Sequence, residues 1–197
     1  MQETTPIIFS KHHTSCVVGV LDIVRSTEIT LPLTADNIDE FYRIFLEMIT
    51  DTLVKNSARL IKNIGDGVLF YFPDTVALNE HSLLGVVTCA HALHDIREQL
   101  NAALAKASLP AISFRVSLSY GPVSAMLGER GEISDLFGAT VTTCAKINRL
   151  ADENTCVVGE ALHNVLLPYY QDMEKKTEYR IGDSVSFSVF TLNYDKE

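Results

Sequence analysis

The 197-residue sequence lacks the long apolar run that a membrane-spanning helix needs, and its start lacks the basic-then-apolar pattern of a signal peptide. It also contains no internal repeat, low-complexity tract or obvious linker. These absences predict one soluble, cytosolic (cytoplasmic) domain, and the 47% hydrophobic content is ample for a core. We assign residues 1–14 to a lead-in, 15–192 to the domain and 193–197 to a C-terminal tail.

Paired cysteines and an excess of basic residues are absent as well. The four cysteines are scattered without a C-x-x-C pair, which favours buried free thiols over a zinc site. The formal net charge is −9, whereas a surface that binds nucleic acid needs excess lysine and arginine. We therefore expect neither nucleic acid nor a membrane among the partners. A small anionic ligand needs only a few local donors and is compatible with this charge.

Hydrophobic patterning predicts strands that alternate with helices. Apolar, β-branched runs predict strands at residues 16–23, 59–64, 68–72 and 113–121, and a run at 122–128 is a candidate to pair with the last of these. Amphipathic periodicity predicts two long helices, at 82–107 and at 35–56, the latter capped by Asp36. The remaining predicted elements are a helix at 138–151, a strand at 155–159, a short helix at 160–167 and a hairpin at 178–192 around Gly182-Asp183.

The element order β-α-β-β-α-β indicates an α+β fold. It is the order of a ferredoxin-like βαββαβ core, an antiparallel-rich sheet with its long helices on one face, followed here by a C-terminal extension. Many unrelated functions share this layout, so the function has to be argued from a site. In this layout the first strand is central, and its end comes close to the turn of the hairpin that follows.

Two aspartates stand at that meeting point. Asp22 lies near the end of the first buried strand, where a carboxylate needs a partner, and Asp66 lies in the Gly-Asp-Gly of the hairpin. Neighbouring carboxylates repel each other unless a cation lies between them, and Mg²⁺ binds through one or two carboxylates and substrate phosphates. The pattern therefore favours a metal-nucleotide site. Two simpler interpretations are an Asp-Gly hairpin turn for Asp66 and a loop cap for Asp22.

Three ordered blocks of the sequence carry a family resemblance. The first, "VLDIVRST" at 20–27, is similar to the motif F-x-D-I-x-x-F-T, and the second, "KNIGD" at 62–66, is similar to K-x-x-G-D. The third comprises "FRVSLSYGPVSAMLG" at 114–128 and "DLFGATVTTCAKINRL" at 135–150, and resembles a strand-G-x-V segment followed by D-x-x-G-x-x-V-N-x-A-x-R. The sequence thus resembles the class III nucleotidyl cyclase catalytic domain, the family of adenylyl and guanylyl cyclases.

The resemblance implies attack of a ribose 3′-oxygen on the α-phosphorus of a nucleoside triphosphate, with release of pyrophosphate. By resemblance, two Mg²⁺ or Mn²⁺ ions are held by Asp22, Asp66 and the carbonyl of Ile23. The β- and γ-phosphates would lie on the backbone N–H groups of Val24, Arg25, Ser26 and Thr27. The Arg25 side chain would add a positive charge there, although a solvated loop arginine is the commoner outcome.

The resemblance also bears on the base and on assembly. Lys62 would donate to adenine N1 and Asp135 would accept from the N6 amino group, a pair of the adenylyl type, whereas guanylyl members typically carry Glu and Cys. The alternatives are a solvent-facing strand lysine for Lys62 and a loop cap for Asp135. Family members place the metal residues and the base-reading residues of one site on two chains, so we expect a symmetric homodimer, ATP as substrate and an inactive monomer.

Three positions depart from the family pattern. Thr142 and Lys146 stand where the family has a ribose-orienting Asn and a transition-state Arg, and Arg180 is the candidate for a late phosphate-binding cation. Loss of one transition-state donor typically costs about 10²–10³ in turnover. The sequence therefore predicts a slow adenylyl cyclase. The alternative is a degenerate cyclase-homology domain that binds nucleotide and regulates a partner; a diguanylate cyclase is disfavoured because no G-G-D/E-E-F hairpin is present.

Overall fold

The computed structural model describes residues 8–10, 14–181 and 185–194. Over these residues the chain forms a nine-stranded, mostly antiparallel sheet whose main path runs β3-β4-β2-β5-β7-β9-β8, while β1 and β6 pair with β5. The expected turn at Gly182-Asp183, most of the predicted lead-in and residues 195–197 of the predicted tail lie outside the described residues. The strands are β1 (Ile8–Phe9), β2 (Thr14–Ile23), β3 (Arg59–Ile64), β4 (Gly67–Phe72), β5 (Phe114–Leu127), β6 (Ile133–Phe137), β7 (Cys156–Gly159), β8 (Met173–Ile181) and β9 (Val185–Leu192).

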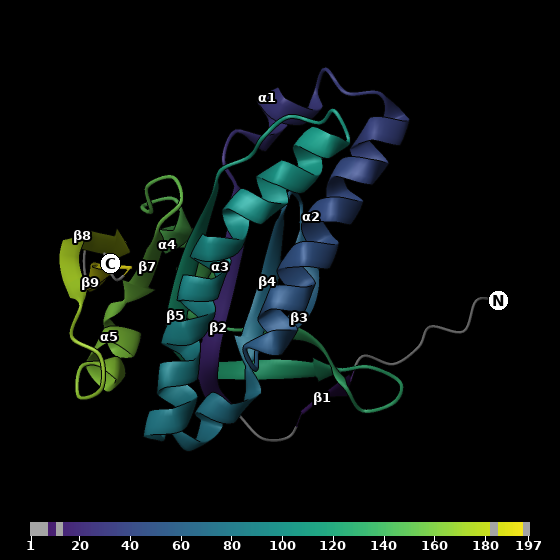
Figure 1. Cartoon of the computed structure of the whole chain (residues 1–197). Helices are drawn as coiled ribbons and strands as arrows, with labels where there is room; N and C mark the ends of the chain where they lie inside the picture. The colour runs from purple at the N-terminus through teal and green to yellow at the C-terminus, as the bar shows by residue number, and fades with distance from the viewer. Residues whose placement is uncertain (1–7, 11–13, 182–184, 195–197) are drawn as a thin grey trace.

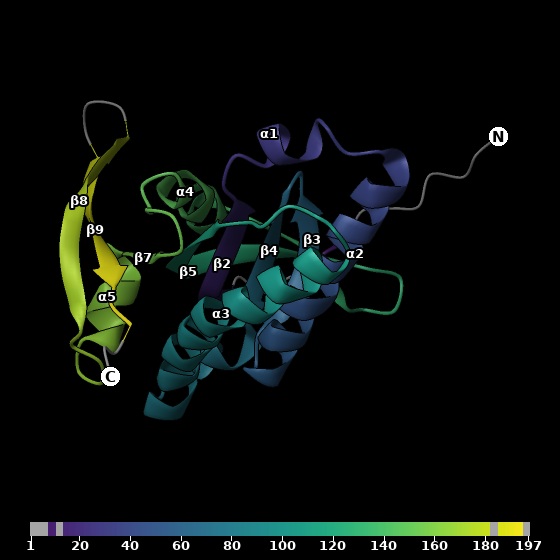
Figure 2. The ribbon, with the colours of Figure 1, turned by 45° about the horizontal axis from the view of Figure 1, so that its top comes forward.

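The predicted α+β fold with a ferredoxin-like core is confirmed. The chain runs β2, α2 (Ala35–Lys55), β3, β4, α3 (Glu80–Lys106), β5, and β2 lies between β4 and β5 in the sheet. Figures 1 and 2 show both long helices side by side across one face of these strands. This arrangement places the C-terminal end of β2 beside the hairpin that joins β3 to β4.

The two long helices form where the apolar period predicts, but one cap differs. Phe41, Phe45 and Ile49 recur every four residues of α2 and are buried against the sheet. The N-cap of α2 is Thr34, whose hydroxyl accepts from the Asn37 N–H, so the assignment of Asp36 as the cap is wrong. Asp36 instead lies in the first turn, where its negative charge interacts favourably with the positive end of the helix dipole.

The predicted pair of strands at 113–121 and 122–128 is instead one long strand, β5. The predicted boundary falls between Gly121 and Pro122, but both residues stay in the ladder, where Gly121 faces Cys16 and Pro122 faces Ser15 of β2. Beyond Val123, which still pairs with Thr14 of β2, the strand takes new partners: β6 along Ser124–Leu127, and β1 opposite Met126 and Leu127. Figure 1 shows this part of β5 turning across the sheet beneath β2 and β4.

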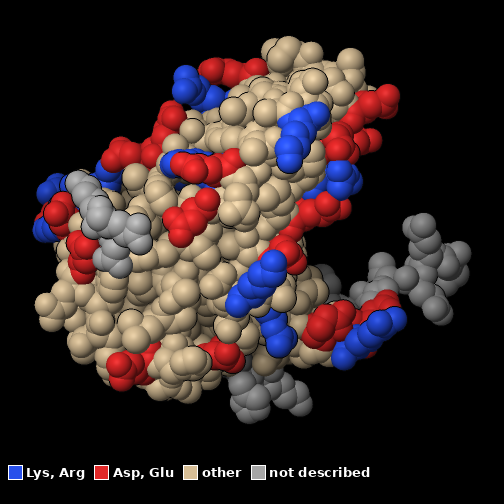
Figure 3. All heavy atoms as spheres, viewed as in Figure 1, with Lys and Arg blue, Asp and Glu red and all other residues tan. Residues whose placement is uncertain are grey.

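Shorter elements complete the domain. Helix α4 (Ala139–Asn148) packs on the face of the sheet away from α2 and α3, and its own side chains Cys144 and Ile147 are buried. The others are α1 (Ser26–Thr30), the 3₁₀ helix η1 (Pro73–Ala77) and α5 (Glu160–Leu166). Within the described residues, no helix is both long and apolar enough to span a membrane. Figure 3 shows acidic and basic side chains interspersed over one face of the molecule, without a continuous basic surface.

Candidate active site

The fold brings Asp22 and Asp66 to neighbouring strand ends. Asp22 of β2 stands opposite Gly67 of β4, and Asp66 is the residue directly before Gly67. The hairpin turn consists of Gly65 and Asp66, because Ile64 and Gly67 form the last pair of the β3–β4 ladder. Asp66 therefore occupies the turn, as predicted, but its turn partner is Gly65 rather than the Gly67 of an Asp-Gly turn. Gly65 adopts a φ of 63°, which glycine tolerates at such a turn position.

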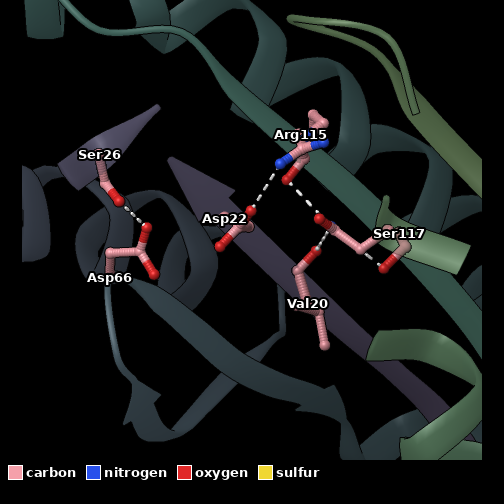
Figure 4. A network of polar contacts seen from close by, with 7 residues as sticks. Val20, Asp22, Ser26, Asp66, Arg115 and Ser117 are labelled. Carbon is pink, nitrogen blue, oxygen red and sulfur yellow. Dashed lines mark hydrogen bonds and ion pairs between the residues drawn. The ribbon is translucent and has the colours of Figure 1, made fainter. Parts of the chain in front are cut away.

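Asp22 has an arginine partner that sequence reasoning missed. Arg115, which faces Asp22 in the β2–β5 ladder, donates from Nη2 to Asp22 Oδ2 at 2.9 Å (Figure 4). Burial raises the pKa of the Asp22 carboxyl, and the charge of Asp66 raises it further, while Arg115 lowers it without cancelling these effects. An arginine inside the apolar run of β5 was the available signal, because a charged group at a buried strand position needs a partner.

Asp66 is held by the loop that follows β2. The Ser26 hydroxyl donates to Asp66 Oδ2 (Figure 4). The expected phosphate-binding segment therefore contacts the second aspartate directly. Val24 is removed from the predicted phosphate-binding segment, because its N–H already donates to the Ser113 carbonyl at 2.9 Å. Thr27 is exposed, as is Arg25, whose guanidinium forms an ion pair with Glu153 at 3.3 Å.

The donor set at these strand ends suits a hard divalent cation. Each aspartate gives one carboxylate oxygen to a protein donor, Arg115 or Ser26, and the other oxygen accepts no hydrogen bond from any described residue. The effect of Asp66 on the pKa of Asp22 reflects repulsion that a cation between them would relieve. No cluster of three or more acidic, histidine or cysteine ligands occurs among the described residues. This composition fits Mg²⁺ or Mn²⁺, which take one or two carboxylates together with water and phosphate.

The two expected base-reading residues lie in contact with each other. Lys62 of β3 donates from Nζ to Asp135 Oδ2 at 2.5 Å, and the ammonium also stands 5.8 Å from the centre of the Phe137 ring. Asp135 belongs to strand β6 and is only 7% exposed, so it is not the cap of a solvent-exposed loop. Its Oδ1 accepts the Leu136 N–H at 2.8 Å, which fixes the carboxylate.

The departures from the family motif all lie on exposed surface. Thr142 and Lys146 are exposed and stand one turn apart on α4, and no hydrogen bond or ion pair among the described residues joins them to Asp22 or Asp66. Asn148 does not replace the missing asparagine, because its amide is buried and donates to Val20 O at 3.0 Å. Arg180 is exposed on β8, four strands from β2, on the order of 19 Å at 4.8 Å per strand.

The fold is that of a nucleotidyl cyclase catalytic domain. The Adenylate and Guanylate cyclase catalytic domain family matches residues 8–193, and the chain therefore belongs to this family. The chain is 26% identical to an adenylate cyclase of Streptomyces coelicolor over 150 residues, which are 76% of this chain and 34% of that protein. It is 24% identical to an adenylate cyclase of Streptomyces griseus over 161 residues, 82% of this chain and 35% of that protein. The chain thus spans about a third of the length of both relatives.

Solved structures share the fold at low sequence identity. The adenylyl cyclase CyaB from P. aeruginosa superposes with a TM-score of 0.81 at 14% identity, over 94% of this chain and 96% of that one. The guanylate cyclase domain of RhGC from Catenaria anguillulae, solved in complex with GTP, gives a TM-score of 0.77 at 17% identity, over 95% of this chain and 100% of that one. At these identities the likeness shows the fold, and adenylyl and guanylyl enzymes share it.

Proposed function

We propose that this domain is an adenylyl cyclase that converts ATP to 3′,5′-cyclic AMP and pyrophosphate. The observation that carries the proposal is the meeting of Asp22 and Asp66 across the β2–β4 ladder, where two half-buried carboxylates share one strand end. The preference for ATP rests on a second observation, the fixed Lys62–Asp135 pair. Two curated relatives that match this chain are adenylate cyclases, which agrees with that preference.

In the proposed reaction the ribose 3′-oxygen bonds to the α-phosphorus, the bond from that phosphorus to the bridging oxygen breaks, and pyrophosphate leaves. Asp22 and Asp66, with the carbonyl of Ile23, would hold two Mg²⁺ or Mn²⁺ ions. Bound there, the ions would promote loss of the 3′-hydroxyl proton to water and neutralise the triphosphate. Arg115 keeps Asp22 in place through its 2.9 Å contact, and the N–H groups of Arg25–Thr27 would support the phosphates.

Base recognition follows from the chemistry of two side chains. The Lys62 ammonium would donate to adenine N1, and the Asp135 carboxylate would accept from the N6 amino group. Guanine presents an N1–H donor and an O6 acceptor at the corresponding positions, so both groups would meet the wrong partner. The contact of Asp135 with the Leu136 N–H supports this role, because it orients the carboxylate before the base arrives.

We propose a homodimer with its active sites at the subunit interface. Thr142 and Lys146 lie on the exposed face of α4, and no hydrogen bond or ion pair among the described residues joins them to Asp22 or Asp66 of their own chain. In a second chain facing the site, the Thr142 hydroxyl would hydrogen-bond the ribose and the Lys146 ammonium would oppose the transition-state charge. Arg180 is the candidate phosphate ligand from the same second chain. Lysine supplies a point charge rather than a planar fork, so turnover would fall below the typical value of about 10 s⁻¹.

A second candidate function has one observation in its favour. The positions of the family's Asn and Arg hold Thr142 and Lys146, which are weaker groups for the ribose and for the transition state. A domain of this kind could bind nucleotide and regulate a partner with little or no turnover.

The test is cyclic-nucleotide formation by the purified chain from ATP and from GTP, each with Mg²⁺ and Mn²⁺. We expect cyclic AMP in excess of cyclic GMP, abolished by Asp66→Asn and retained in Asp74→Asn, an exposed aspartate of η1. Nucleotide binding without any cyclic product, unchanged by Asp66→Asn, would support the regulatory module instead. Preference for GTP would overturn the assignment of the base.

A further inference from the structure

We propose that Ser26 is a positioning residue for the metal site, and that its hydroxyl holds Asp66 in the orientation that binds the cations. This inference rests on the proposed function, because it assigns Asp66 the role of a metal ligand. The observation behind it is the hydrogen bond from Ser26 Oγ to Asp66 Oδ2, between residues 40 positions apart in the chain (Figure 4).

The loop between β2 and α1 is built to direct this hydroxyl. The Val24 N–H is anchored on the Ser113 carbonyl, and Arg25 then takes a left-handed conformation with φ 54° and ψ 34°. Steric strain makes that region rare for non-glycine residues, so the surrounding contacts must favour it. The turn buries Ser26, which is 8% exposed, and its carbonyl accepts from the Thr30 hydroxyl at 2.9 Å.

The chemistry of the donor distinguishes Asp66 from Asp22. Asp22 contacts a guanidinium, which neutralises part of its charge, whereas Asp66 contacts a neutral hydroxyl. A neutral hydroxyl orients the carboxylate without bringing a positive charge beside it, so Asp66 is neutralised less than Asp22 and attracts a cation more strongly. Partners that orient a metal ligand typically contribute a factor of about 10–100 in metal affinity. We expect a contribution of that size from Ser26.

The bond also links two parts of the proposed site. Ser26 belongs to the segment whose N–H groups would support the phosphates, and its side chain reaches the carboxylate that would hold the ions. A triphosphate that orders this segment would therefore also order Asp66. The hydroxyl is the only side-chain donor to Asp66 among the residues that the structure describes.

The experiment is a titration of the full chain with Mn²⁺ alone, in which electron paramagnetic resonance measures the concentration of free ion. The wild type, Ser26→Ala and Ser26→Thr are compared. We expect Ser26→Ala to weaken Mn²⁺ binding by about 10–100-fold and Ser26→Thr, which keeps the hydroxyl, to restore most of it. In the cyclase assay Ser26→Ala should raise the KM for the metal more than it lowers kcat. Ser82→Ala is the matched control, a 7% exposed serine whose hydroxyl bonds in the first turn of α3.

The outcomes separate this inference from the proposed function. Ser82→Ala should lower the melting temperature and leave Mn²⁺ affinity unchanged. In an Asp66→Asn background, Ser26→Ala should cause no further loss, because the two residues act through one contact. Unchanged Mn²⁺ affinity in Ser26→Ala, or additive losses in the double variant, would overturn the inference even if the wild type produces cyclic AMP. Mn²⁺ binding that depends on Ser26, without any cyclic product, would overturn the proposed function alone.

Discussion

Gly67 of β4 lies against the carbonyl of Leu21 in β2 so closely that a Cβ at position 67 would stand 2.4 Å from that oxygen. The same Cβ would stand 3.2 Å from the Cα of Asp22. Real Cβ atoms do not approach backbone oxygens so closely, and backbone cannot move aside as a flexible side chain can. The absence of a side chain at Gly67 is therefore what allows the hairpin turn, and with it Asp66, to approach Asp22.

Gly67→Ala should therefore destabilise the domain and separate the two aspartates. We expect a loss of about 1–3 kcal/mol in the free energy of unfolding, as for other overpacked sites, together with weakened Mn²⁺ binding. Urea denaturation monitored by circular dichroism measures the first quantity. Gly85→Ala is the control, because this glycine of α3 has open space around its Cβ position and alanine favours helix. Equal stability of the Gly67→Ala variant and the wild type would contradict the argument.

Base preference is expected to depend on the Lys62–Asp135 pair. The double variant Lys62→Glu with Asp135→Cys should lower the ratio of kcat/KM for ATP over GTP by at least about tenfold, because the donor and the acceptor for adenine are both lost. Changing both residues together avoids leaving the 7% exposed Asp135 carboxylate buried without its cation. Lys55→Gln, at an exposed lysine at the end of α2, serves as the control, because it lowers the net charge by the same single unit as the double variant. A preserved ratio in the double variant would remove both residues from base recognition.

The homodimer proposal predicts complementation between two damaged chains. Asp66→Ala removes a metal ligand and Lys146→Ala removes the transition-state cation, so each variant alone should be nearly inactive. In a mixture, a heterodimer would contain one site with both wild-type residues, and random exchange should restore about a quarter of wild-type activity. Activity measured against mixing ratio should peak at equal amounts. A mixture no more active than its separate components would argue for a site contained within one chain.

The four cysteines should be inert in the folded protein. Burial raises the pKa of Cys16 and of Cys144 to about 11 and that of Cys89 to about 12, and raises the pKa of Cys156 as well. At pH 8 less than about 1% of these thiols would be thiolate, the form that reacts with alkylating reagents. Mass spectrometry after iodoacetamide should find no adduct on the native chain and four after urea treatment. Rapid labelling of any one of these residues in the native chain would contradict its burial.

The same shifts give a pH dependence of stability. The pKa of these thiols has its ordinary value of 9.0 in the unfolded chain and is about 11–12 in the folded chain. Because the folded-state pKa values are raised, this contribution to stability is fully present below pH 9 and is lost as the pH rises toward 11–12. Replacing Cys89 by alanine should flatten the fall of the urea midpoint over this range. An unchanged slope would show that other groups cause the fall.

Much of the fold could be predicted from the sequence because the period of its apolar residues is strong. Helix α2 and strands β2, β3 and β4 lie within a few residues of the expected ranges. The exceptions arise from contacts distant in the chain. The predicted strand boundary falls between Gly121 and Pro122, yet β2 holds both residues in the ladder. The strand β6 was not expected, because its five residues become a strand only by pairing with the far end of β5.

Part of the site could also be predicted from the pattern of apolar residues. A carboxylate at the end of an apolar strand is unusual because it needs a partner, so Asp22 could be identified from the sequence. The predicted strand layout then placed Asp66 beside it. Arg115 was missed although it obeys the same rule, because an arginine in a strand is usually assigned to the exposed face. The Ser26–Asp66 bond depends on the left-handed conformation of Arg25, and nothing in the local sequence predicts that conformation.

Strand β8 lies at the outer edge of the sheet, and its residues Glu174, Lys175, Lys176, Glu178 and Arg180 are all charged. An unpaired strand edge is a template on which further chains can polymerise, and closely spaced charges discourage such growth. Fibre-like stacking through this border is therefore disfavoured. Copies of the domain should therefore not add strands to β8 even in a concentrated preparation.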